Sequence, residues 1–314
     1  MLALIPLLAC SGDSSDDSAQ DTDTPDTDTD TDTDTDTEPT PVWTENRVET
    51  SSTLQGVYAS GEGVYVVGTD GKAWVGGAST AWVEMSPEVD ENHLTDVWGQ
   101  GAGDSVELFV TAHGGYVARY QLGAWSVEDI GTSNHEGIGG TATALYAVSW
   151  GGIYRWDGVS WTFESPPGDA RVNDVWAQGE SAIAVGQSGV ILTRAADGTW
   201  SEVESGTDQD LHAVDGIAGD LWAVGNEGTV LHFDGTSWTP SDAGTTVALW
   251  TVFAPEPGAV YVAGNNGVAK VWDGGAWTTL PTGVDNNLYA LHGINGQNVW
   301  AVGNRGMAIQ YKAQ

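Results

Sequence analysis

The sequence is poor in cysteine and in basic residues. Its 314 residues include one cysteine, Cys10, so the chain cannot form an internal disulfide bond. Nine lysine and arginine residues stand against 44 aspartate and glutamate residues, which gives a formal net charge of −35 at pH 7. Proteins that bind nucleic acid or anionic membrane surfaces need clusters of basic side chains to contact phosphates. The composition therefore excludes nucleic acid as a partner and favours cations and basic proteins.

The sequence also lacks a hydrophobic run long enough to span a bilayer. Its first residues, "MLALIPLLAC", are apolar only as far as Ala9 and look like the hydrophobic region of an export signal. The segment "LLAC" resembles the lipobox of bacterial lipoproteins, although no basic residue precedes it. That resemblance implies that residues 1–9 are a lipoprotein signal segment and that Cys10 carries lipid. The alternative is an apolar N-terminus with an incidental cysteine.

Residues 11–41 contain no large apolar side chain. They hold 12 acidic residues and no basic ones, mostly in Asp-Thr repeats. Such a segment cannot bury a core, and its like charges keep it extended. We therefore expect residues 10–41 to form a lipidated, disordered linker to a folded domain at 42–314. Serine follows the cysteine, which in the lipoprotein family implies the outer membrane.

The rest of the chain is built from a repeat of about 39 residues. A phrase of the form L-x-x-V-W begins seven times, with intervals of 40, 41, 37, 39, 38 and 39 residues, at Leu54, Leu94, His135, Val172, Leu211, Leu249 and Leu288. The fifth copy shows four strand-like runs, at 211–217, 221–225, 229–233 and from 237. Turns such as "GNEG" and "DGTSW" between them are typical of antiparallel hairpins. Four antiparallel strands at this period predict an all-β, seven-bladed β-propeller.

The last repeat is incomplete. A tryptophan opens the fourth run of the first six copies, but the seventh copy ends at Gln314 before reaching one. Residues 42–53 begin "VWT", which matches other copies, and with the 27 residues of the last copy these 12 make 39. We therefore expect an N-terminal strand to complete the last blade and close the ring, which protects strand edges. The repeated tryptophans are expected to pack within the fold.

The repeats over residues 42–314 resemble propellers of myxobacterial-type surface lipoproteins, and loosely those of sialidase-like proteins and photosystem assembly factors. The sialidase Asp-box order is not reproduced, and the arginines are scattered. Metalloprotease, nucleophile-elbow and phosphate-loop motifs are also missing. The sequence therefore predicts a non-enzymatic binding or scaffolding propeller without a resident cofactor. We expect a monomer that takes a protein or glycan ligand at the bacterial envelope and meets the membrane only through its lipid.

Acidic loops form the first candidate site. The segments between the fourth run of one repeat and the first run of the next carry 17 acidic residues against two arginines. Hard carboxylate oxygens suit calcium, and they also attract basic partners. The alternative is that a strongly acidic chain has acidic loops everywhere. The candidate residues of this acidic rim are Asp90, Glu91, Glu128, Asp129, Asp208 and Asp210.

The second candidate site is the mouth of the central channel. Polar residues near the start of the first runs are expected there, and the sequence leaves open whether its histidines hold a metal. An alternative function follows from the same place, because paired carboxylates with separated pKa values serve glycosidases and lyases. The candidate residues are Asp96, His135, Glu136, Asp174 and His212.

Overall fold

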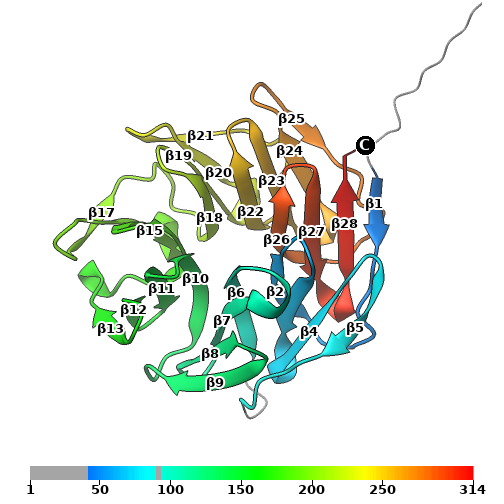
Figure 1. The fold of residues 1–314 in the computed structure, drawn as a ribbon. Helices are drawn as coiled ribbons and strands as arrows, with labels where there is room; N and C mark the ends of the chain where they lie inside the picture. The colour runs from blue at the N-terminus through cyan, green and yellow to red at the C-terminus, as the bar shows by residue number, and fades with distance from the viewer. Residues whose placement is uncertain (1–41, 90–92, 314) are drawn as a thin grey trace, which may run out of the picture. The chain divides into compact units, whose positions relative to one another are not determined.

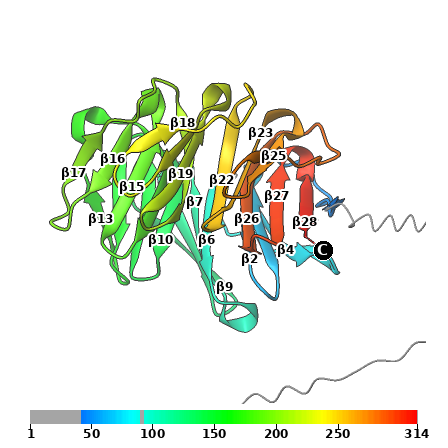
Figure 2. The same cartoon turned by 90° about the horizontal axis from the view of Figure 1, so that it is seen from above.

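The computed structural model of the protein describes residues 42–89 and 93–313. They form seven four-stranded antiparallel sheets arranged as blades in a ring (Figure 1). This confirms the predicted seven-bladed propeller. No helical turn in this described part of the chain is long and apolar enough to cross a membrane. Figure 2 shows the ring from the side.

In every blade the first strand lies nearest the axis and the fourth lies at the outer edge (Figure 1). Blade 1 comprises β2 (Leu54–Ala59), β3 (Val64–Gly68), β4 (Lys72–Gly77) and β5 (Thr80–Glu84). Blade 2 comprises β6 (Leu94–Gln100), β7 (Glu107–Ala112), β8 (Tyr116–Gln121) and β9 (Ala124–Asp129). Blade 3 comprises β10 (His135–Thr141), β11 (Ala144–Ser149), β12 (Gly152–Trp156) and β13 (Trp161–Glu164).

The remaining blades repeat this order. Blade 4 comprises β14 (Val172–Gln178), β15 (Ser181–Gly186), β16 (Ile191–Arg194) and β17 (Trp200–Val203). Blade 5 comprises β18 (Leu211–Ile217), β19 (Asp220–Gly225), β20 (Val230–Phe233) and β21 (Trp238–Pro240). Blade 6 comprises β22 (Leu249–Glu256), β23 (Ala259–Gly264), β24 (Ala269–Trp272) and β25 (Trp277–Thr279). Blade 7 comprises β26 (Leu288–Asn295), β27 (Asn298–Gly303), β28 (Ala308–Lys312) and β1 (Val42–Glu45).

Strand β1 closes the ring as the incomplete last repeat predicts. It pairs antiparallel with β28, with Trp43 opposite Tyr311 and Thr44 opposite Gln310. Trp43 is 7% exposed and packs with Phe253 and Tyr261 of blade 6. The two ends of the described chain therefore meet in one sheet, and backbone hydrogen bonds join them (Figure 1).

The second strand of each blade is the most apolar because blades cover both of its faces. All residues of β3, β7 and β11 are buried. Burial on two faces explains why these strands appear in the sequence as continuous apolar runs rather than alternating ones.

Tryptophans of the fourth strands bind neighbouring blades together. Each packs in a cluster with side chains of the preceding blade. Trp200 lies edge-on to Tyr146 at 6.0 Å, and its Nε1 donates to Glu164 at 2.8 Å. Trp277 meets Trp222 in the same way at 5.7 Å. The repeated tryptophan is thus a packing residue, as the sequence predicts.

The "GxxG" turns between second and third strands depend on glycine. In five blades they are short 3-10 turns: η1 (Thr69–Gly71), η4 (Gln187–Gly189), η5 (Asn226–Gly228), η6 (Asn265–Gly267) and η7 (Asn304–Gly306). At Gly228, with φ of +72°, a Cβ atom would lie 2.0 Å from the Thr245 carbonyl oxygen. The loop that enters the next blade therefore packs directly on this turn. Two other 3-10 turns are η2 (Gly103–Ser105) and η3 (Pro167–Asp169).

Replacing Trp43 by alanine should weaken the closure of the ring and lower the stability of the whole domain. The substitution removes a buried indole between blades 6 and 7, which costs about 3–5 kcal/mol of unfolding free energy. Val42→Ala is the matched control, because Val42 is adjacent in the same strand but 61% exposed. Thermal and urea melts of both variants measure the difference. Equal losses of stability would contradict the role of Trp43 in closure.

Candidate functional site

Each first strand carries a β-bulge at its second residue. In all seven blades, the pairing between the first and second strands skips one residue of the first strand. The residue before the bulge is buried in every blade, and the bulged residue is half-buried. Bulges redirect a side chain relative to a regular strand. The bulged residues are Gln55, Thr95, Glu136, Asn173, His212, Trp250 and Tyr289.

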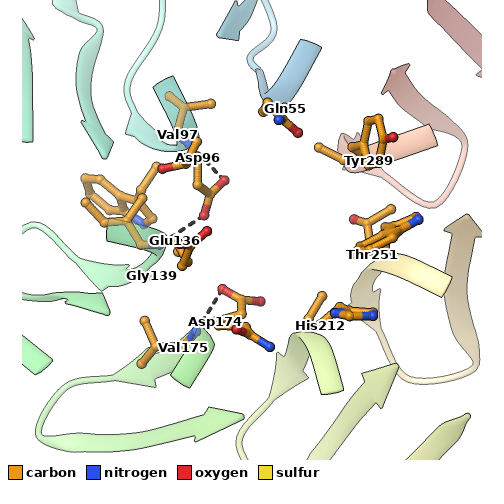
Figure 3. A pocket seen from close by; sticks show the side chains of 18 of the residues that line it. Gln55, Asp96, Val97, Glu136, Gly139, Asp174, Val175, His212, Thr251 and Tyr289 are labelled. Atoms are coloured by element: carbon orange, nitrogen blue, oxygen red, sulfur yellow. Dashed lines mark hydrogen bonds between the residues drawn. The ribbon is translucent and has the colours of Figure 1, made fainter. Parts of the chain in front are cut away.

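These seven side chains surround a cavity of about 870 Å³ on the ring axis. Figure 3 shows Gln55, Glu136, His212 and Tyr289 around the opening. The volume lies in the range of pockets that enclose small ligands or short chain segments. Because each bulged residue has a different side chain, the cavity presents a chemically varied surface on a repeated scaffold. We call this opening, with its seven bulged residues, the channel mouth.

One side of the channel mouth is aromatic. The rings of His212 and Trp250 stack with centroids 4.2 Å apart and planes 27° apart. Trp250 also meets Tyr289 at 5.7 Å and 61°. We call these three residues the aromatic wall. Turns of blades 5 and 6 orient it: Trp250 Nε1 donates to Asn265 Oδ1 at 2.7 Å, and His212 Nε2 lies 2.9 Å from Asn226 Oδ1.

The other side of the channel mouth is polar, and Glu136 lies there across the opening from the aromatic wall (Figure 3). Thr95 and Asn173 use their side chains to bond backbone carbonyls of the next blade. By contrast, no hydrogen bond to the Glu136 carboxylate is found among residues 42–89 and 93–313. Burial raises the pKa of this carboxyl. Glu136 is therefore the carboxylate of the mouth that is free to meet a ligand.

Asp96 and Asp174 face the channel but hold neighbouring blades together. Asp96 accepts hydrogen bonds from the Val97 and Ile138 N–H groups at 2.8 and 3.0 Å. Asp174 does the same with Val175 and Val214, at 2.8 and 2.9 Å. In each case the second donor belongs to the following blade. Asp96 and Asp174 thus line the cavity as expected, but backbone N–H groups already occupy their carboxylate oxygens (Figure 3).

Two further acceptors make the same kind of link deeper in the channel. Asp215 accepts the Ala254 N–H at 2.8 Å, and His292 Nδ1 accepts the Ala59 N–H at 3.1 Å. Burial raises the pKa of Asp96 and Asp215 to about 6, and lowers the pKa of His292 to about 4. Burial and the neighbouring Asp96 carboxylate raise the pKa of Asp174 well above its usual value.

The other predicted mouth residues divide between cavity and core. His212 is part of the aromatic wall, and burial lowers its pKa. His135 does not line the cavity: it is fully buried in blade 3, at the position that leucine or valine occupies in other blades. Its ring lies edge-on to Tyr154 at 5.2 Å, and burial lowers its pKa to about 4.

The predicted acidic rim is spread around the ring. Glu128 and Asp129 precede blade 3, whereas Asp208 and Asp210 precede blade 5. Asp210 lines the cavity and accepts the Ser188 N–H at 2.8 Å. Asp90, Glu91 and Cys10 lie outside the described residues. Within residues 42–89 and 93–313, no group of three or more His, Cys, Asp or Glu side chains is arranged to hold a metal ion.

Of the aromatic wall, His212 was predicted from the sequence, whereas Trp250, Tyr289 and the bulges were not. A signal was present: the second residue of the repeated L-x-x-V-W phrase differs in every copy, although its neighbours are mostly apolar. A strand with regular alternation would place that residue in a blade interface, and only the bulge brings it to the axis.

Comparison with protein-family models and with curated proteins gives no match. Solved structures share the fold at low identity. The structure described as YCF48 bound to D1 peptide has a TM-score of 0.71 and 17% identity, over 87% of this chain and 97% of its own. YCF48 from Cyanidioschyzon merolae gives 0.69 and 18%, over 86% and 99%. Virginiamycin B lyase from Staphylococcus aureus gives 0.77 and 12%, over 87% and 100%. The expected likeness to photosystem assembly-factor propellers is confirmed at the level of the fold.

The buried Asp215 carboxyl should make stability depend on pH in a defined direction. Its pKa in the fold, about 6, exceeds the ordinary 3.8, so the ionised form is disfavoured in the folded state. That cost is absent below pH 4 and complete above pH 6. Relative to wild type, Asp215→Asn should gain up to about 3 kcal/mol between pH 4 and pH 8.

Urea melts across that pH range measure the gain. Asp234→Asn is the contrasting control, because Asp234 accepts two backbone N–H groups in an exposed turn and these bonds lower its pKa. Because this pKa lies below 3.8, the carboxyl is ionised in both states over most of that range, and its variant should differ from wild type by a nearly constant amount. Parallel pH profiles for Asp215→Asn and wild type would contradict the assignment.

Proposed function

We propose that the protein is a non-enzymatic binding module of the bacterial envelope, which holds a segment of a partner protein at the channel mouth. The observation that carries this proposal is the ring of seven bulged side chains. They are chemically different, half-buried and placed on a closed, rigid scaffold. Loops and irregular positions on such scaffolds are where binding residues concentrate.

The neighbouring structures support a protein ligand only in part. YCF48 is a propeller of the same fold that is bound to a peptide in a solved structure. At 17% identity the likeness concerns the fold alone. The proposal for this chain therefore rests on the residues of its own channel mouth. A glycan is the other ligand class that an aromatic surface could take, and the experiment below distinguishes the two.

The enzymatic alternative is a glycosidase or lyase, and virginiamycin B lyase shares the fold. Acid–base chemistry of that kind needs two carboxyl groups, or a carboxyl and another titratable group, free to exchange protons with substrate. Asp96 and Asp174 are each occupied by two backbone N–H donors. Glu136 alone remains free among the three predicted carboxylates, which disfavours a glycosidase mechanism that uses two of them.

The mouth is tested by panning the full chain, with Cys10→Ser to keep it soluble, against a random 12-residue peptide library on phage. Peptides that bind wild type should lose roughly fivefold or more in affinity for Trp250→Ala, since a group stacked on an aromatic side chain contributes about 1–3 kcal/mol. Phe163→Ala is the control, because Phe163 is 51% exposed on the outer strand of blade 3.

Two results would contradict the proposed function. One is a set of peptides whose affinity is the same for Trp250→Ala, Tyr289→Ala and wild type. The other is a glycan array that gives mouth-dependent binders where the peptide library gives none. Thermal melts of each variant establish that it is folded before affinities are compared.

The envelope location rests on Cys10 and the acidic linker. If Cys10 is lipidated, cells labelled with a fatty acid should incorporate it into the wild-type protein, which should sediment with membranes. Cys10→Ser should abolish the label and release the protein, because one or two acyl chains supply the membrane affinity. Ser11→Ala is the control that leaves the cysteine in place. An unlabelled, soluble wild type would rule out the anchor.

A further inference from the structure

In the part of the chain that the structure describes, no lysine or arginine lines the cavity at the channel mouth. None of the nine lysine and arginine residues of the chain is among the residues that line it. Arg171 lies over the ring of the lining residue Trp150 at 5.3 Å, but it does not line the cavity itself. Among residues 42–89 and 93–313, five carboxyl groups line the cavity: Asp96, Glu136, Asp174, Asp210 and Asp215.

Four histidines line the cavity, and burial lowers the pKa of three of them, His113, His212 and His292, below the ordinary value of 6.5. These three are therefore largely neutral at pH 7. The fourth, His93, lies beside His113, with ring centroids 5.3 Å apart. A cavity walled by low-dielectric protein concentrates the field of its charges. An anionic ligand would enter against that field, and a cationic one would enter with it.

The aromatic wall adds a surface that suits a cation. Ring faces carry negative electrostatic potential, and tryptophan offers the strongest attraction to ammonium and guanidinium groups. Hydrogen bonds to Asn226 and Asn265 hold His212 and Trp250 in position before any ligand arrives. Preorganised contacts of this kind raise affinity because little side-chain freedom is lost on binding.

Glu136 completes the arrangement from across the opening. It is half-buried, lies on the polar side of the mouth and has no hydrogen-bond partner among residues 42–89 and 93–313. The carboxylates of the two adjacent blades, Asp96 in blade 2 and Asp174 in blade 4, accept hydrogen bonds from backbone N–H groups. A charge-assisted hydrogen bond to Glu136 would satisfy an oxygen that the fold leaves open.

We propose that the channel mouth binds a lysine or arginine side chain of a peptide segment, with the aliphatic or planar part on the aromatic wall and the charge facing Glu136. This inference rests on the proposed function and specifies its ligand chemistry. A neutral sugar would use the aromatic wall but leave the cavity's charge uncompensated, so the charge distribution favours the basic peptide.

The test uses peptides enriched on wild type from the random library described above. The sequences should be rich in lysine and arginine, and replacing the shared basic residue by glutamine should lower affinity for wild type roughly tenfold or more. Glu136→Gln should cause a loss of similar size with the basic peptide. It should cause little further loss with the glutamine peptide, because the two changes remove one interaction.

Glu202→Gln is the matched control, since it removes one negative charge from the exposed outer strand β17. It should leave the affinity almost unchanged at 150 mM salt, where distant exposed charges are screened. Equal losses of peptide affinity for Glu136→Gln and Glu202→Gln would show that only the net charge of the protein matters, and this would overturn the inference. Mouth-dependent peptides that are neutral or acidic would overturn it as well, while the proposed binding function would stand. Absence of any mouth-dependent peptide would overturn both.

Discussion

The backbone pairing of β1 with β28 is the constraint on which the rest of the structure depends. It joins the two ends of the described chain in one sheet and so holds seven blades in a closed ring. Only in a closed ring do seven first strands face a common axis. The cavity, the aromatic wall and the approach of Glu136 across the opening all require that geometry. The geometry of the channel mouth therefore depends on a contact at the outer edge of a blade.

Side-chain links between blades fix the ring at its inner edge. Blades 2, 4 and 6 carry Asp96, Asp174 and Thr251 directly after the bulge, and each accepts a backbone N–H from the following blade. The other blades have glycine or alanine there, and a Cβ atom on Gly137 would lie 2.8 Å from Asp174 Oδ1. Large polar residues thus alternate with small ones because each needs room from its neighbour. At the seam of blades 3 and 4, the buried Arg194–Glu164 ion pair at 2.7 Å adds a link further out.

The sequence predicts the fold far better than the site. Repeat period, turn glycines and the displaced Trp43 identify seven blades and their closure, because each is a local pattern tied to backbone geometry. Glu136 and His212 are also found from their place in the repeat. Trp250 and Tyr289 are missed, because tryptophan and tyrosine occur throughout the repeats as packing residues, and only the three-dimensional bulge distinguishes these two. The prediction that His135 lies at the channel mouth is wrong for a related reason. A histidine suggests a functional site, but this one occupies the position of the repeat at which other blades have a buried leucine or valine.

The repeat separates structural from functional positions within one short phrase. Its first residue is buried in all seven blades and builds the core, whereas its third serves the contact between blades. Its second residue takes no part in the pairing of the first two strands, because the bulge releases it. Substitution at that position changes the surface of the mouth and leaves the pairing of the first two strands in place, although at Thr95 and Asn173 it would also remove a side-chain hydrogen bond to the next blade. The fold can therefore carry different mouth chemistries on the same scaffold, and the combination present here is an aromatic wall facing Glu136.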